Sequence, residues 1–458
     1  MRYEHNTTVN FPQSKVFDWF ERKGAFQRLM PPWEVAKVVR ADDSLENGSL
    51  RAFRFPMGPI KLTWESEHLG YEPPHKFEDV MKKGPFKSWH HVHLFEQNGT
   101  TTTVSDQVDY RLPLGPLGRL FGGRMVKKRI ERMFKAREER LIRDMERHAQ
   151  FSNLAKKKIL IAGSSGLIGT QLSAFLDTGG HEVWKLVRRK AKTSENEIQW
   201  EPDEGVINKS SIEGFDIIIH LGGAGIGDKR WTKKRKQKIV SSRKNSTTLL
   251  SDTISSLEKK PEVFMVASAI GYYGNRGDEK LTEESSPGAG FLSDTTQDWE
   301  SYSDSARKAG IRVINIRTGI VLSAVGGALG RMLLPWKLGG GGKIGNGKQW
   351  MSWISIDDQV YAMHHLMMSE NTSGAYNLTA PEPAQQKVFA KTLGRVLRRP
   401  AFAPIPKISM RILFGELAGP LLFEGQHVLP KRLEDSGYQF LHNDLESALR
   451  DTLGIWKK

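Results

Sequence analysis

The chain of 458 residues contains no cysteine. Disulfide bonds, thiolate metal sites and a cysteine nucleophile are therefore excluded, and the composition fits a reducing compartment. No apolar run reaches the roughly 18 residues that a membrane-spanning helix needs. The opening residues, MRYEHNTTVN, lack the apolar core of a signal peptide. These absences predict a cytoplasmic protein without an integral membrane segment.

Acidic residues are too few to balance the basic ones. The chain has 68 Lys plus Arg against 52 Asp plus Glu, a net charge of +16. An excess of this size favours an anionic partner. Nucleic acid, a membrane surface and a phosphorylated small molecule are the three candidates, and charge alone does not distinguish them. With 38% hydrophobic and 26% charged residues the composition is globular. The length allows two or three domains.

The first part of the chain has the pattern of an antiparallel sheet followed by a helix. Short alternating segments separated by turn residues extend from residue 3 to residue 112. Residues 120–145 then carry apolar side chains at helical spacing, which predicts one long amphipathic helix lying on that sheet. The residues of this stripe are Val126, Ile130, Phe134, Leu141 and Met145.

This pattern, with a short helix expected after Pro12, is similar to the START-like, helix-grip superfamily that includes polyketide cyclase-like proteins. The resemblance covers residues 1–150 and implies an α+β domain whose curved sheet grips the terminal helix around a cavity. A hydrophobic ligand is the partner expected for such a domain. The basic residues of the terminal helix would either face anionic lipid or form a solvated surface.

Three histidines, His90, His91 and His93, lie in one of the expected strands. Alternation along a strand places His91 and His93 on the same face, as two ligands of a metal site would be. A third ligand is not evident from the sequence, and hydrogen-bonded histidines are far commoner than metal ligands. We therefore predict no metal site.

From residue 157 onward, continuous apolar strands alternate with helices. This pattern predicts a doubly wound parallel sheet with helices on both faces, the α/β Rossmann arrangement. The helix-rich, proline-punctuated end of the chain predicts a separate lobe. The expected domains are residues 1–150, residues 157–376 and a C-terminal substrate lobe at residues 377–458.

A glycine-rich loop follows the first strand of this second part. Gly163, Gly166 and Gly169 lie between a strand at residues 159–162 and a helix that begins near Leu167. Glycine permits the sharp turn and lets a pyrophosphate approach backbone amides at the helix N-terminus. The strand before the loop and the helix after it predict a dinucleotide site.

The end of the second strand indicates which dinucleotide is bound. An enzyme that prefers NAD(H) usually has an acidic residue there, whereas this chain has Arg188 and Arg189. Guanidinium groups suit a 2′-phosphate, so NADP(H) is favoured. The alternative is that both arginines lie in a solvated loop. The third strand ends in small residues, Leu221 to Ala224, which would let the cofactor pass close to the backbone.

Residues 157–458 resemble the atypical branch of the extended short-chain dehydrogenase/reductases, often called the epimerase family. The segments that carry the resemblance include HLGGAGIGDKRW, ASAIGYYGNRGDEKLTEESSPGAGFL and LLFEGQHVLPKRLEDSGYQF. The resemblance implies a Rossmann domain that binds NAD(P), and a small end domain at about residues 404–452. The basic string at residues 228–238 matches a family helix, so a nucleic-acid partner is not expected.

The resemblance assigns roles to particular residues. Ser268, at the end of the fourth strand, is the residue that bonds the substrate oxygen in ordinary members. The residues expected to hold the cofactor are Gly163, Ser164, Ser165, Gly166, Leu167, Ile168, Arg188, Arg189, Leu221, Gly222, Gly223, Ala224 and Ala267.

The chain departs from the family at its acid/base pair. Leu292 and Thr296 stand where ordinary members have tyrosine and lysine. Tyr273 is our candidate replacement, with Tyr272 beside it and Arg276 as the cation that lowers a phenol pKa. The alternative is that both tyrosines pack beneath the cofactor.

The sequence thus predicts an NADP(H)-dependent oxidoreductase or epimerase-like enzyme for a small hydroxylated or carbonyl substrate, fused to a domain that binds a hydrophobic ligand. The absent Tyr/Lys pair leaves an alternative, a non-catalytic NADP(H)-binding regulator. Some members of the family have been labelled cell-division inhibitors.

Overall fold

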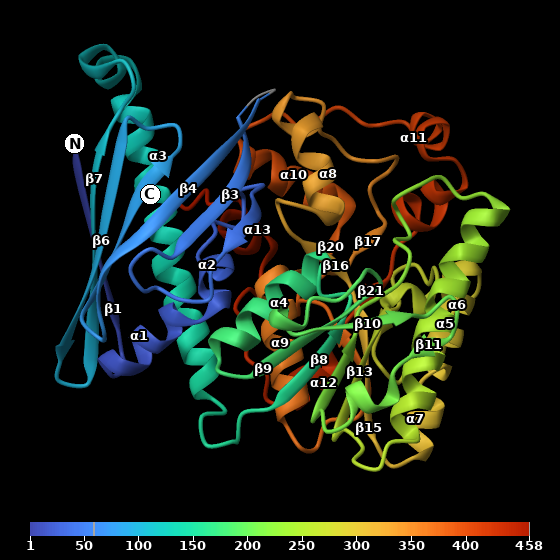
Figure 1. Cartoon of the computed structure of the whole chain (residues 1–458). Coiled ribbons are helices and arrows are strands. Elements are labelled where there is room, and N and C mark those ends of the chain that lie inside the picture. The colour runs from blue at the N-terminus through green and yellow to red at the C-terminus, as the bar shows by residue number, and fades with distance from the viewer. Residues whose placement is uncertain (58–59, 458) are drawn as a thin grey trace. The chain divides into compact units, whose positions relative to one another are not determined.

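The computed structural model describes residues 1–57 and 60–457. The chain divides into two compact units, which are described separately (Figure 1). Unit 1 comprises residues 1–155 with 173–181, and unit 2 comprises residues 156–172 with 182–458. No helix within the described ranges is long and apolar enough to cross a membrane.

Unit 1 is a seven-stranded antiparallel sheet with three helices, in the order β1-β7-β6-β5-β4-β3-β2. This is the α+β helix-grip fold predicted from the sequence. Its strands are β1 (Arg2–Val9), β2 (Lys37–Ala41), β3 (Leu50–Met57), β4 (Ile60–Glu72), β5 (Lys76–Lys83), β6 (Ser88–Asn98) and β7 (Thr101–Arg111). Its helices are α1 (Gln13–Glu21), α2 (Lys23–Arg28) and α3 (Gly115–Ala149).

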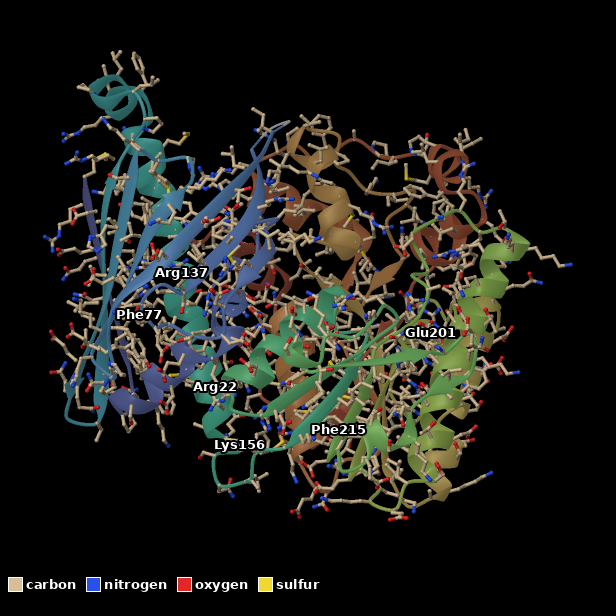
Figure 2. The ribbon with its side chains drawn as sticks, in the orientation of Figure 1. Arg22, Phe77, Arg137, Lys156, Glu201 and Phe215 are labelled. Carbon is tan, nitrogen blue, oxygen red and sulfur yellow. The ribbon has the colours of Figure 1, made fainter. Side chains whose placement is uncertain are left out.

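The apolar stripe of α3 packs as predicted. Ile130 and Phe134 are buried in one hydrophobic cluster, and Leu141 and Met145 in another. The second cluster includes Phe77, labelled in Figure 2, with other aromatic side chains of β6 and α1. The helix is longer than expected and begins five residues before residue 120. Burial of its stripe supplies the apolar contact that holds a 35-residue helix on the sheet.

Unit 2 contains the predicted doubly wound sheet, with eight strands in the order β11-β10-β9-β8-β12-β13-β15-β19. All neighbouring strands are parallel except β11, which is antiparallel to β10. The strands are β8 (Lys158–Ala162), β9 (Glu182–Val187), β10 (Glu197–Glu201), β11 (Val206–Ile207), β12 (Ile217–His220), β13 (Val263–Ala269), β15 (Arg312–Thr318) and β19 (Gly374–Leu378).

The helices of unit 2 follow the strands in alternation and then form the C-terminal segment. They are α5 (Lys233–Ser255), α6 (Phe291–Ser301), α7 (Asp304–Lys308), α8 (Gly327–Lys337), α9 (Ile356–Met368), α10 (Gln386–Leu397), α11 (Lys407–Phe414), α12 (Lys431–Asp435) and α13 (Leu445–Leu453). The helix α4 (Leu167–Thr178) begins in unit 2, and its residues from Ser173 onward belong to unit 1. Unit 2 also contains three two-stranded sheets among its described residues. They are β14 (Lys280–Leu281) with β21 (His427–Val428), β16 (Ile320–Leu322) with β18 (Trp353–Ser355), and β17 (Trp350–Met351) with β20 (Ala384–Gln385).

The core of unit 2 explains why its strands are continuously apolar. Side chains of β8, β12 and β13 pack on one face of the sheet against α5, α6 and α7, and Phe215, labelled in Figure 2, joins this cluster. The chain runs from β8 outward to β10 and then returns to β12 on the other side of β8. Such a reversal opens a crevice at the carboxyl ends of the strands, which is where ligands bind in this architecture.

A buried ion pair joins α2 to α3 in unit 1. Arg28 donates two hydrogen bonds to the carboxylate of Asp144, at 2.7 and 2.6 Å, and both side chains are fully buried. We expect Asp144→Ala to lower the free energy of unfolding by about 3–5 kcal/mol, because it leaves a guanidinium buried without its carboxylate. Chemical denaturation of the full chain measures this. The exposed neighbour Glu146 is the control, and an equally large loss in Glu146→Ala would contradict the assignment.

Candidate dinucleotide and catalytic site

The glycine loop after β8 makes two close approaches that exclude side chains. Gly163 has φ +85°, and a Cβ there would lie 2.8 Å from the carbonyl carbon of Leu221. A Cβ on Gly169 would lie 2.3 Å from the carbonyl oxygen of Gly163. The loop is therefore wedged between the end of β12 and the first turn of α4. Its tip, Ser165 and Gly166, is exposed.

This loop fits a pyrophosphate. Leu167 and Ile168 are the first residues of α4, and N–H groups in the first turn of a helix have no acceptor within the helix. The helix dipole adds partial positive charge at the same place. Residues 163–168 thus form a turn at the carboxyl end of β8 whose backbone chemistry suits an anion.

The small-residue segment after β12 is fastened to α5. Leu221 donates its backbone N–H to Ala162 at 2.8 Å, continuing the pairing of β12 with β8. Ala224 donates its N–H to Ser242 Oγ at 3.0 Å, and Arg243 Nη1 donates to the Ala224 carbonyl at 3.1 Å. Residues 221–224 are thereby held beside the glycine loop, as the cofactor prediction requires.

His220, at the end of β12, supports this segment in its neutral form. The ring is fully buried, and burial lowers its pKa to about 3, with Arg243 acting in the same direction. Nδ1 accepts the N–H of Gly222 at 3.3 Å, so Nε2 carries the proton and donates to Ser246 Oγ at 2.8 Å. The imidazole therefore positions the backbone and is not a proton donor to substrate.

The two arginines after β9 differ in their surroundings. Arg189 makes two hydrogen bonds to the carboxylate of Glu197, at 2.7 and 2.5 Å. Arg188 is exposed, and in the described ranges it has neither a hydrogen bond nor an ion pair. Of these two arginines, Arg188 is therefore the one whose guanidinium N–H groups are all available to a phosphate.

Ser268, in β13, belongs to a buried polar network. Its hydroxyl donates to Glu300 Oε1 at 2.6 Å, and only 4% of the residue is exposed. Arg317 holds the same carboxylate with two hydrogen bonds of 2.8 Å. Ser268 and Arg317 are paired in the register of β13 and β15, and Glu300 reaches them from α6. Ala267 precedes Ser268 and is half-buried.

Glu300 and Arg317 were not among the residues predicted from the sequence. Leu292, Thr296 and Glu300 are spaced four residues apart in one helix, so they lie on one face of α6. The face that carries the acid/base pair in ordinary family members thus carries a carboxylate here, one turn further along. Helical spacing from Leu292 is the signal that indicates Glu300.

The surroundings of Tyr273 favour its packing role. The residue is fully buried, its hydroxyl donates to Asn377 Oδ1 at 2.7 Å, and it accepts from Arg317 Nη1 at 3.0 Å. Burial raises its pKa to about 12, although Arg317 acts in the opposite direction. The phenol therefore keeps its proton and is held between Asn377 and Arg317.

The cation predicted beside these tyrosines is a different one. Arg276 pairs with Glu279, three residues further on, and also donates to Ser286. The guanidinium next to the phenols is Arg317, which stacks over the ring of Tyr272 at 3.5 Å. The prediction for Arg276 was wrong because a local carboxylate takes up its charge.

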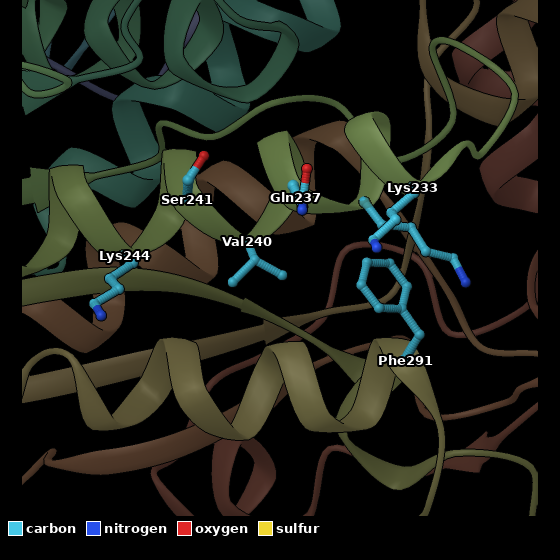
Figure 3. Close-up of a pocket in the computed structure, with 7 residues that line it drawn as sticks. Lys233, Gln237, Val240, Ser241, Lys244 and Phe291 are labelled. Atoms are coloured by element: carbon cyan, nitrogen blue, oxygen red, sulfur yellow. The ribbon is translucent and has the colours of Figure 1, made fainter.

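An open hollow lies between α5 and α6 (Figure 3). Its lining mixes apolar and basic side chains, and none of the predicted site residues is among them. The lining residues are Lys233, Lys236, Gln237, Val240, Ser241, Lys244 and Phe291. The lysines account for part of the charge excess of the chain.

Comparison with known families agrees with this geometry. Residues 159–379 match the NAD dependent epimerase/dehydratase family, and residues 9–134 match polyketide cyclase/dehydrase and lipid transport proteins. Residues 405–452 match a domain of unknown function. An epimerase family protein of Mycobacterium bovis is 39% identical over 65% of this chain and 97% of its own length. The chain belongs to the epimerase family.

Related structures show the same fold. The crystal structure of a nucleoside-diphosphate sugar epimerase from Corynebacterium glutamicum has a TM-score of 0.81 and 32% identity, and the match covers 99% of this chain and 90% of that one. A human epimerase family protein solved with NADPH has a TM-score of 0.59 and 32% identity, over 65% of this chain and 99% of its own. An epimerase family protein of Bacillus subtilis is 37% identical over 64% of this chain and 96% of its length.

The close approach at Gly169 gives a test of the loop. We expect Gly169→Ala to weaken binding of NADPH by at least about tenfold, because the new methyl group displaces the backbone of Gly163 and Ser164. Fluorescence titration measures the dissociation constant. Gly122→Ala is the matched control, since Gly122 also lies in a helix but has nothing within 4 Å of its Cβ position. Equal affinity in both variants would contradict the loop assignment.

Proposed function

We propose that this protein is an NADP(H)-dependent oxidoreductase or epimerase that acts on a small hydroxylated or carbonyl substrate. The observation that carries the proposal is the Ser268, Glu300 and Arg317 network at the carboxyl end of β13 and β15. β13 is two strands from β8, so this network and the glycine loop are separated laterally by about 10 Å. That spacing suits a dinucleotide laid across the crevice.

The residues of the crevice fit the cofactor by their chemistry. The turn at residues 163–168 would hold the pyrophosphate, and residues 221–224 would lie along the adenosine side. When bound, NADP(H) would supply or accept the hydride of the reaction. The exposed guanidinium of Arg188 would hold the 2′-phosphate, and the human relative solved with NADPH supports this choice over NAD(H).

Ser268 and Glu300 would handle the proton in place of the absent Tyr/Lys pair. The hydroxyl proton of Ser268 is already donated to Glu300, so Ser268 Oγ meets a substrate hydroxyl as an acceptor. In oxidation the substrate proton passes to Ser268 Oγ as the serine proton passes to the Glu300 carboxylate. In reduction both transfers run in reverse. Arg317 keeps the carboxylate in place through both directions.

The N-terminal unit is proposed to bind a hydrophobic small molecule. Its match to polyketide cyclase/dehydrase and lipid transport proteins supports this role. The domain limits of residues 1–150, 157–376 and 377–458, and a cytoplasmic location, stay predictions.

Cofactor choice is tested at Arg188. We expect Arg188→Ala to weaken NADPH binding by about 10- to 100-fold, the value of a charge-assisted hydrogen bond of about 1.5–3 kcal/mol, and to leave NADH binding almost unchanged. Isothermal titration calorimetry with both cofactors measures the ratio. Arg189→Ala is the matched control, because Arg189 is already engaged by Glu197. Equal losses for NADPH and NADH at Arg188 would rule out the assigned phosphate contact.

Proton transfer is tested in α6 and β13. We expect Ser268→Ala and Glu300→Gln each to lower kcat by about 100-fold or more in a screen of carbonyl compounds that follows loss of NADPH absorbance, with cofactor affinity retained. Asp298→Asn, an exposed carboxylate in the same helix, is the control and should keep full activity.

The regulator alternative makes the opposite prediction in this assay. It requires tight NADPH binding without turnover of any compound in the screen, by the parent chain as well as by the variants. Undiminished turnover in Glu300→Gln would show that the protein is an enzyme but that Glu300 does not take part in proton transfer.

A further inference from the structure

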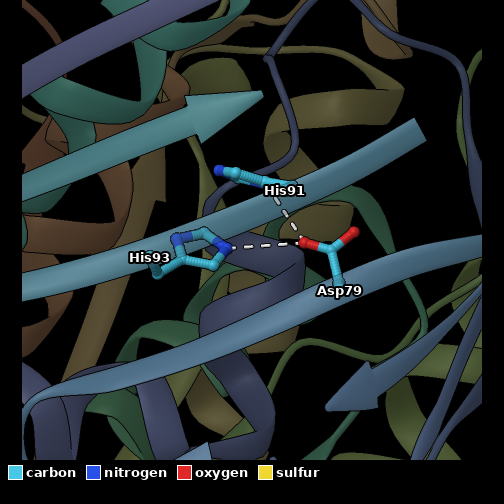
Figure 4. Close-up of side chains that lie close together, drawn as sticks. All are labelled: Asp79, His91 and His93. Atoms are coloured by element: carbon cyan, nitrogen blue, oxygen red, sulfur yellow. Dashed lines mark ion pairs between the residues drawn. The ribbon is translucent and has the colours of Figure 1, made fainter. Parts of the chain in front are cut away.

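A second group of titratable side chains lies in the interior of unit 1, remote in sequence from the crevice residues. Asp79 comes from β5, and His91 and His93 come from β6 (Figure 4). Both histidines are at least 94% buried, with exposed fractions of 2% and 6%. One carboxylate oxygen of Asp79, Oδ2, lies 3.0 Å from His91 Nδ1 and 3.5 Å from His93 Nε2.

These three atoms have the spacing of metal ligands. A tetrahedral zinc ion with ligands at 2.0–2.1 Å separates neighbouring ligand atoms by about 3.3 Å. The two distances from Asp79 Oδ2 lie on either side of that value. In Figure 4 both imidazoles turn one nitrogen toward the same carboxylate, as ligands around a shared centre do. Two histidines and one carboxylate are also a donor set that suits zinc and other divalent transition metals.

Asp106, from β7, occupies the opposite side of the two rings. Its Oδ1 lies 2.9 Å from His91 Nε2 and 2.8 Å from His93 Nδ1. In metal sites the ring nitrogen of histidine that does not bind the metal usually donates its proton to a carboxylate. Asp106 accepts a hydrogen bond from His91 Nε2, which would fix His91 in the tautomer that binds a metal through Nδ1, and it lies close to His93 Nδ1.

Two buried ring nitrogens of this cluster have no hydrogen-bond partner among the described residues. They are His93 Nδ1, despite its short distance to Asp106, and His68 Nε2. His68, on β4, is paired with Asp79 in the strand register, and burial lowers its pKa to about 4, so its ring is neutral. Aromatic side chains surround the group: Phe77 stacks on His93 at 4.1 Å, and Phe134 lies 5.4 Å from His91. An apolar shell of this kind makes an unbalanced charge in the cluster costly.

We propose that Asp79 Oδ2, His91 Nδ1 and His93 Nε2 bind a divalent transition-metal ion of the zinc class, with water as the fourth ligand. Asp106 orients His91 through its Nε2 and lies beside the Nδ1 of His93. The sequence alone does not indicate Asp79 as a third ligand, because it is 12 residues from His91 and meets it only through the pairing of β5 with β6.

The cluster without a metal would be a network of ion pairs. In that state Asp79 and Asp106 each have a carboxylate oxygen near a ring nitrogen of His91, at 3.0 and 2.9 Å. Arg137, on α3, also faces the two aspartates, and burial lowers its pKa. A divalent ion would balance the two carboxylates in place of these ion pairs.

The test is a direct titration of the full chain with Zn²⁺. The purified protein is stripped with a chelator, dialysed and titrated at pH 8 by isothermal calorimetry. The metal content before stripping is measured by mass spectrometry. We expect one Zn²⁺ per chain in a single tight class. Co²⁺ in the same place should show the intense visible absorption of a tetrahedral site. If the parent chain does not bind Zn²⁺ tightly, the proposal is wrong and the cluster is a network of ion pairs. This outcome is decisive without any variant.

Variants then locate the ion. His93→Ala and Asp79→Asn should weaken Zn²⁺ binding by more than about 100-fold, and Asp106→Asn by about 10- to 100-fold. His90→Ala is the matched control: His90 lies on the same strand but faces outward, half-exposed and paired with Glu78. Circular dichroism confirms folding of each variant. Tight binding that survives in folded His93→Ala, or is lost in His90→Ala, overturns the assigned ligands.

Discussion

The geometry of the candidate active site depends on the ion pair between Arg317 and Glu300. The pair joins β15 to α6, and it presents one carboxylate oxygen to the hydroxyl of Ser268. Both partners are largely buried, with 5% and 13% of their side chains exposed. A charge in such surroundings is stable only with its partner, so the serine, the carboxylate and the buried Tyr273 are held as one unit. Proton transfer without the usual Tyr/Lys pair is consistent with this arrangement.

Features encoded by short segments could be predicted from the sequence. The glycine loop, the alternation of β8 to β13 with helices, and the stripe on α3 follow from local spacing, and the structure contains each of them. Contacts between distant segments could not be predicted in this way. Arg317 meets Ser268 only because β13 and β15 pair in one particular register. Arg276 was assigned to a phenol by proximity in the chain, and its neighbour Glu279 binds it instead.

The same limit applies to the buried histidines of unit 1. Alternation along β6 placed His91 and His93 on one face, and the structure confirms that both are buried there. Asp79 and Asp106 reach them from the flanking strands β5 and β7, through pairings that no single-strand pattern contains. In a chain without cysteine, histidine and carboxylate are the side chains left to bind a transition metal, and unit 1 concentrates them within an aromatic interior.

The most direct test of the central claim is a crystal structure of the protein with NADP⁺. We predict the pyrophosphate on residues 163–168, the 2′-phosphate on Arg188, and the nicotinamide ring against Ser268 with Glu300 still paired to Arg317. A dinucleotide bound with its nicotinamide away from Ser268, or no density for the cofactor in the crevice of unit 2, would contradict the account.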